Sequence, residues 1–269
     1  EAEELFRIIA QVKAKGVTVV FISHRLDEVK RICDSVTVLR DGRKVVSMSI
    51  DAASVDDIIR YMVGRDIVNK YPKMKQPWGE EALSVEGLER KGVLHNISFK
   101  VHTGEILGIS GLVGAGRTEM ARAITGADKI DAGVIKLFGK EVKIKSPRDS
   151  INAGIAFLPE DRKNQGLILI QTILFNTSLV RLDRYTSFSF LKLRSIRQMV
   201  EKIASELRLR ATNVNSVVGE LSGGNQQKVV IAKWLLTKAK VFIFDEPTRG
   251  IDVGAKVEVY NLINELIAK

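Results

Sequence analysis

Residues 221–248 read LSGGNQQKVVIAKWLLTKAKVFIFDEPT and contain the two patterns that decide the fold. The first, LSGGNQQK (221–228), places a serine and two glycines at the start of a long helical pattern. The second, VFIFDEPT (241–248), is an apolar strand that ends in Asp245 and Glu246. Ionised side chains at the end of a buried strand need a partner such as a metal ion. We therefore expect Asp245 to associate with Mg²⁺ and Glu246 to be the base that orients an attacking water.

A glycine-rich stretch upstream, GLVGAGRTE (111–119), predicts a phosphate-binding loop between a strand and a helix. It fits the pattern G-x-x-x-x-G-K-[ST] at every defined position except the lysine, where Arg117 stands. Glycines let backbone amides curl around phosphate groups, and the N-terminus of the following helix favours anions. The hydroxyl of Thr118 is expected on Mg²⁺. The residues expected to bind the nucleotide are Gly111, Gly114, Ala115, Gly116, Arg117, Thr118 and Glu119.

Arg117 leaves three interpretations of this loop open, because a planar guanidinium is no geometric substitute for a compact ammonium. The loop can be a working nucleotide site, a site that binds nucleotide but turns it over poorly, or a glycine-rich turn without a ligand. A dinucleotide-binding fingerprint does not fit, since Glu119 stands where its third glycine belongs.

The signature LSGGNQ followed closely by the DEPT strand resembles the ATP-binding cassette (ABC) ATPases, and the joint match is very specific. The resemblance implies an α/β fold, with a P-loop NTPase core of ABC type, an antiparallel β subdomain and a helical signature subdomain. It also implies that the signature residues clamp the γ-phosphate of ATP held by the P-loop of a partner domain. Those residues are Ser222, Gly223, Gly224 and Gln226, and Asp252 falls in the loop through which two such domains sense each other.

Further motifs resemble one branch of this family, the ATPase subunits of bacterial monosaccharide importers, which fuse two cassettes in one chain. They are MVGR (62–65), PEDRK (159–163) and DEPTRGIDVGAK (245–256). In that branch the second cassette typically carries GAGRTE in its phosphate loop. Glu160 stands where most ABC ATPases have a glutamine that contacts Mg²⁺, so the resemblance adds Glu160 to the residues expected to bind the nucleotide. This exchange and Arg117 together predict a site that binds ATP but hydrolyses it poorly.

The resemblance also implies a division of the chain. FISHRLDEV (21–29) resembles the switch-histidine segment of a first cassette, with His24 as a catalytic sensor of the γ-phosphate. Residues 1–66 are therefore expected to be the C-terminal remnant of that cassette, and residues 67–80 a linker. Residues 81–269 would be the second cassette, truncated before its own switch segment. ELFRIIAQVKAK and EVYNLINELIAK, at the two ends, align without gaps, as a tandem duplication or any two amphipathic helices would.

The coarse pattern predicts helices over 2–15, 25–33 and 54–63, and a hairpin that turns at Asp41-Gly42. It also predicts strands over 17–23 and 105–110, within a largely parallel sheet covered by helices.

Composition narrows the class of protein. The 269 residues are 45% hydrophobic and 28% charged, as in ordinary globular proteins. No apolar run is long enough to span a bilayer, and no leader pattern opens the sequence, so neither a membrane span nor a signal peptide is predicted. The net charge of +10 comes from basic residues scattered among acidic neighbours, without aromatic side chains to stack bases, so we expect no nucleic-acid partner.

The leading hypothesis is thus the energy-coupling ATPase of a sugar importer, with ATP and Mg²⁺ as cofactors and a peripheral place at the cytoplasmic face of the plasma membrane. Its partners would be membrane permease subunits, the missing first cassette and, indirectly, a periplasmic or extracellular sugar-binding protein. Two alternatives are a regulatory cassette that binds nucleotide without catalysis and a soluble twin-cassette ATPase of ribosomes. Which sugar is carried is not encoded in this sequence.

Overall fold

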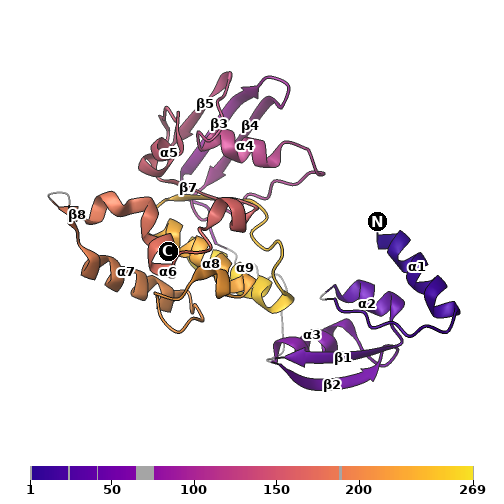
Figure 1. Cartoon of the computed structure of the whole chain (residues 1–269). Coiled ribbons are helices and arrows are strands. Elements are labelled where there is room, and N and C mark those ends of the chain that lie inside the picture. The colour runs from indigo at the N-terminus through magenta and orange to yellow at the C-terminus, as the bar shows by residue number, and fades with distance from the viewer. Residues whose placement is uncertain (1, 24, 41, 65–75, 188–189, 269) are drawn as a thin grey trace. The chain divides into compact units, whose positions relative to one another are not determined.

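The fold was obtained as a computed structural model, which describes residues 2–23, 25–40, 42–64, 76–187 and 190–268. The chain divides into two compact units (Figure 1). The smaller unit comprises residues 1–72 with 252–258, and the larger unit comprises residues 73–251 with 259–269.

Residues 2–63 form a hairpin with three helices. The elements are α1 (Ala2–Ala14), α2 (Leu26–Ile32), β1 (Ser35–Arg40), β2 (Arg43–Ser49) and α3 (Val55–Val63). β1 and β2 pair in antiparallel fashion, as the hairpin signal predicts. The side chain of Ser54 caps α3 by accepting from the amide of Asp57, and Gly64 ends this helix in the left-handed conformation. The core of this unit centres on Val38, Ile58 and Ile59.

The strand expected over residues 17–23 is wrong. These residues form no regular element and pair with no strand among the described residues, and the side chains of Val20 and Ile22 are 85% and 92% exposed. A β-strand exists only where a neighbouring strand pairs with its backbone, so an apolar, β-branched run is not sufficient by itself.

The larger unit begins with an antiparallel sheet in the order β4-β3-β5-β6. Leu83, Val85 and Leu88 of β3 are buried beneath α4, which contributes Met120 and Ile124 to the same core. The elements up to the parallel pair are β3 (Glu81–Arg90), β4 (Leu94–His102), α4 (Arg117–Ile124), β5 (Ala132–Leu137), β6 (Lys140–Glu141), α5 (Pro147–Ala153) and β7 (Ile155–Leu158).

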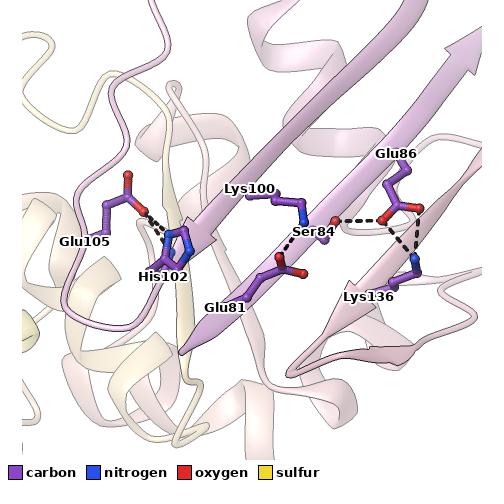
Figure 2. Close-up of polar contacts among 7 residues, drawn as sticks. All are labelled: Glu81, Ser84, Glu86, Lys100, His102, Glu105 and Lys136. Carbon is purple, nitrogen blue, oxygen red and sulfur yellow. Dashed lines mark hydrogen bonds and ion pairs between the residues drawn. The ribbon is translucent and has the colours of Figure 1, made fainter. Parts of the chain in front are cut away.

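Polar side chains link neighbouring strands of this sheet (Figure 2). Lys100 of β4 pairs with Glu81 of β3 at 2.7 Å, and Lys136 of β5 pairs with Glu86 of β3 at 2.8 Å. The hydrogen bond from Lys136 holds the pKa of Glu86 below its usual range. At the end of β4, Nδ1 of His102 lies 3.0 Å from the carboxylate of Glu105. The pairs made by Lys100 and Lys136 are partly exposed to solvent, where ion pairs stabilise a fold little.

The rest of the larger unit is mostly helical. Its elements are η1 (Arg162–Gly166), α6 (Ile173–Ser178), η2 (Leu179–Tyr185), β8 (Thr186–Ser187), β9 (Phe190–Leu191), α7 (Leu193–Glu206), η3 (Val218–Glu220), α8 (Gly223–Leu235) and β10 (Val241–Phe244). The last helix, α9 (Val253–Ile267), is divided between the two units, since its residues up to 258 belong to the smaller one. The helices α6, α7 and α8 pack on one another, and Val229, Val230 and Ile231 of α8 are fully buried. β10 pairs with β7 in parallel, and this pair carries the acidic residues at its end.

Two expectations for this unit are wrong. Residues 105–110 form no strand, and Ile106 and Ile109 are 57% and 45% exposed. The sheet is also not largely parallel, because the parallel part that the structure describes is the β7–β10 pair alone. The apolar pattern of 105–110 fits a strand, but no described strand pairs with its backbone.

Candidate nucleotide site

The start of α4 lies against the end of β10. The hydroxyl of Thr118 donates a 2.6 Å hydrogen bond to Oδ2 of Asp245, which is 9% exposed. These residues are 127 positions apart in the sequence. The fold thus joins the two motifs expected to bind Mg²⁺ and nucleotide.

Glycines give the loop before α4 its shape. Gly114 and Gly116 both have left-handed backbones, with φ of +82° and +86°. A Cβ on Gly116 would lie 3.3 Å from the side chain of Leu94, so this position also has little room. Residues 111–115 of the loop are exposed, whereas Gly116 is buried. Arg117 to Glu119 form the first turn of α4. Free backbone amides at such a helix start suit an anionic ligand.

Arg117 pairs with the expected general base. Its Nη1 lies 3.3 Å from Oε1 of Glu246, whose side chain is 42% exposed. Glu246 also has a left-handed backbone, with φ of +42°, which is unusual for a residue with a Cβ. An ion pair of this kind occupies the carboxylate that would otherwise accept a proton from water.

Glu160 also has an arginine partner, because Nη1 of Arg249 contacts its carboxylate. The sequence interpretation missed Arg249. The available signal was its place in DEPTRG, directly after the acidic strand end and its turn. Both glutamates expected at the phosphates are thus neutralised by arginines of the same unit.

The signature residues lie at the start of α8. Ser222 is the N-cap residue, and its hydroxyl accepts a 2.9 Å hydrogen bond from the side chain of Asn225 rather than from a backbone amide. Gln226 is buried, and its Nε2 donates to the carbonyl of Val218 at 3.2 Å. Gly223 opens the helix and Gly224 is buried within its first turn. The N-terminus of a helix of this length attracts phosphate.

The last two predicted site residues are Asp252 and His24. Asp252 accepts a 2.9 Å hydrogen bond from the amide of Ala255, which caps the start of α9. His24 lies outside the described residues, and its expected role stays a prediction.

The donors at the start of α4 fit Mg²⁺ in kind, since Thr118 and Asp245 offer the hard oxygen ligands that this ion prefers. Within the described ranges, no group of three or more His, Cys, Asp and Glu side chains forms a further metal site. The same part of the chain contains no helix with the length and apolar character needed to cross a bilayer.

One lysine of α8 is half-buried. Lys233 of α8 donates to the carbonyl of Gly166, at the end of η1, and burial lowers the pKa of Lys233 to about 8 from 10.5. Between these two values the unfolded chain holds a proton that the folded chain has lost. The free energy of unfolding should therefore rise with pH across this window, by at most about 3 kcal/mol.

The pH dependence of Lys233 is testable by urea unfolding at pH 7.5, 8.5 and 9.5. We expect the rise to be absent in Lys233→Met and present in Lys238→Met, which alters an exposed lysine just beyond the same helix. Parallel pH dependence in all three proteins would contradict the assigned pKa.

Comparison with known proteins bears directly on this site. The family model described as ABC transporter matches residues 94–249, more than half of the chain. The chain belongs to the ABC transporter family. The matched range includes the phosphate loop, the signature residues and the acidic strand end.

Curated ABC relatives match almost the whole chain. The ribose import ATP-binding protein RbsA of Oceanobacillus iheyensis is 46% identical over 266 residues, which are 99% of this chain and 54% of the relative. A putative ribose/galactose/methyl galactoside import ATP-binding protein of Agrobacterium fabrum is 46% identical over 271 residues, covering 100% of this chain and 54% of the relative. The chain thus spans about half the length of the relatives it matches.

Solved ABC structures confirm the fold class. A nucleotide-free ATP-binding cassette from an ABC transporter superposes with a TM-score of 0.60 at 28% identity, covering 70% of this chain and 78% of that one. The ADP conformation of another ATP-binding cassette gives a TM-score of 0.57 at 26% identity, covering 71% and 78%. The expected α/β fold of ABC type is correct.

Proposed function

We propose that the chain is part of the ATP-binding, energy-coupling subunit of an ABC importer for a monosaccharide. The observation that carries the proposal is the hydrogen bond from Thr118 to Asp245, because it unites the phosphate loop with the acidic strand end. The names of the relatives, which specify ribose or galactose import, support a sugar as the cargo.

The residues have distinct roles in this proposal. The backbone amides of Gly111 to Glu119 bind the phosphates, and Arg117 supplies a positive charge. Thr118 and Asp245 hold Mg²⁺, which would neutralise phosphate charge when bound. Glu246 accepts the proton of the attacking water, and Glu160 takes part in nucleotide binding. The signature residues Ser222, Gly223, Gly224 and Gln226 address the nucleotide of a partner cassette, His24 senses the γ-phosphate there, and Asp252 belongs to the interdomain loop.

Slow hydrolysis at the Arg117 site is part of this proposal. The ion pair between Arg117 and Glu246 supports it, since a carboxylate that contacts a guanidinium at 3.3 Å is not free to orient a water. The same contact favours a second candidate function, a regulatory cassette that binds nucleotide without catalysis. Detectable turnover that depends on Glu246 would distinguish the importer ATPase from that regulatory cassette.

The proposed organisation follows from these roles. Residues 1–66 would be the end of a first cassette, 67–80 a linker and 81–269 most of a second cassette. The partners would be the other parts of the first cassette, permease subunits in the membrane and, through the permease, a sugar-binding protein. The proposed place is the cytoplasmic face of the plasma membrane.

MgATP binding, measured by isothermal titration calorimetry, tests the site. We expect wild-type protein to bind, and Arg117→Ala to weaken binding by about 10- to 100-fold, the effect of one charged hydrogen bond. Arg194→Ala, on the exposed side of α7, is the matched control and should bind as wild type does. A wild-type protein without affinity for MgATP would contradict the proposal.

A further inference from the structure

A buried arginine lies two residues after Glu160. Arg162 is 8% exposed and begins η1, a π-helical turn of the kind that often marks functional sites. Its guanidinium makes three hydrogen bonds to segments far along the chain. Nη1 donates to the carbonyl of Arg249 at 2.6 Å, Nη2 to the carbonyl of Gly250 at 3.0 Å, and Nε to Oε1 of Gln226 at 3.4 Å.

Glycines make room for this side chain. A Cβ on Gly223 would lie 2.7 Å from Nη2 of Arg162 and 3.1 Å from the carbonyl of Gly250. Gly250 has a left-handed backbone, with φ of +64°, and directs its carbonyl toward the guanidinium. The first glycine of the signature is therefore needed for the arginine to reach its acceptors.

The acceptors of Arg162 indicate that this side chain positions neighbouring segments rather than only stabilising the fold. The acceptors of Arg162 are two backbone carbonyls and one amide oxygen, so its buried charge is solvated by dipoles. The desolvation free energy of a buried charge cancels much of the free energy gained from its hydrogen bonds. An apolar side chain of similar size in the same space often gives a fold of equal or higher stability. A planar fork, however, fixes the directions of several acceptors at once, which an apolar side chain cannot do.

We propose that Arg162 is a positioning residue, which holds the N-terminus of α8 in fixed register with the turn after the acidic strand. The proposal rests on the function proposed above, in which the signature residues address a phosphate. Arg162 would set the direction of the amides at Gly223 and Gly224. It would also tie them to the loop that carries Glu160, so these three segments move together.

Hydrogen exchange measured by mass spectrometry tests this role without requiring any activity. In Arg162→Met, amides of residues 222–226 and 249–250 should exchange at least about 10-fold faster than in wild type. Arg162→Lys keeps one donor direction and should restore part of the protection. The matched control is Arg181→Met, because Arg181 is also 8% exposed but donates to the side chain of Asn152 at 3.3 Å instead. It should leave exchange at both segments unchanged.

MgATP supplies the second readout. Arg162→Met should keep the MgATP affinity of the Arg117 site at its wild-type value, because the signature residues address the nucleotide of a partner cassette. If Arg162→Met does not fold, Gly223→Ala perturbs the same contact from α8 and should speed exchange at the same residues. Unchanged exchange in Arg162→Met, or an equal change in Arg181→Met, would overturn the proposal. Wild-type protein that binds no MgATP would refute the proposed function instead, while the exchange pattern still decides the role of Arg162.

Discussion

Glu246→Gln is expected to lower MgATP turnover by about 100-fold or more, the usual contribution of a general base. Glutamine keeps the size of the side chain but cannot accept a proton from water. MgATP affinity should be retained or increase, because the substitution also releases Arg117 from its ion pair at 3.3 Å. Since slow hydrolysis is proposed, single-turnover release of labelled phosphate is the suitable measurement.

Glu141→Gln is the matched control for this experiment, as Glu141 is an exposed glutamate of β6. It should leave both affinity and turnover at their wild-type values. Equal turnover in wild type and Glu246→Gln would mean that another group activates the water, and the assigned role of Glu246 would be wrong.

Gly133→Ala is expected to lower the free energy of unfolding by about 3 kcal/mol, through backbone strain and a steric clash. Gly133 has φ of +114° in β5, beside the irregular pairing with β3. Its Cβ would lie 2.7 Å from Cα of Leu88 and 2.9 Å from the carbonyl of Gly87. These are backbone atoms at the centre of the sheet and cannot move independently of it. Urea unfolding monitored by circular dichroism measures the change.

Gly139→Ala is the control that separates the cost of backbone strain from the cost of a steric clash. Gly139 also has a positive φ, +74°, but a Cβ there would meet nothing within 4 Å. Its loss of stability should be about 1 kcal/mol, from the backbone alone. If both variants lose the same stability, close packing against β3 contributes nothing.

The sequence was sufficient for features that depend on local chemistry. The turn between β1 and β2 and the start of α8 at Gly223 both follow from short-range preferences. The contact between the phosphate loop and Asp245 joins two motifs that are far apart in the sequence. Their spacing does not indicate that they meet in space, so this prediction depended on the family resemblance.

Features that depend on distant partners could not be predicted. Residues 17–23 and 105–110 have the pattern of strands, but strand formation depends on a neighbour that no local pattern reveals. The arginine partners of Glu160 and Glu246 were missed for the same reason. Arg162 belongs to the PEDRK motif, but its acceptors lie 64 to 88 residues further along the chain.

The backbone conformation of Glu246 sets the stability of the protein against its activity. Its φ of +42° is one that glycine adopts without steric cost and glutamate does not. A glycine at this position would relieve the strain and remove the carboxylate in one step. Selection for a more heat-resistant protein alone would therefore favour losing the very group that the reaction needs. Where Glu246 is kept, stability has been given up for function.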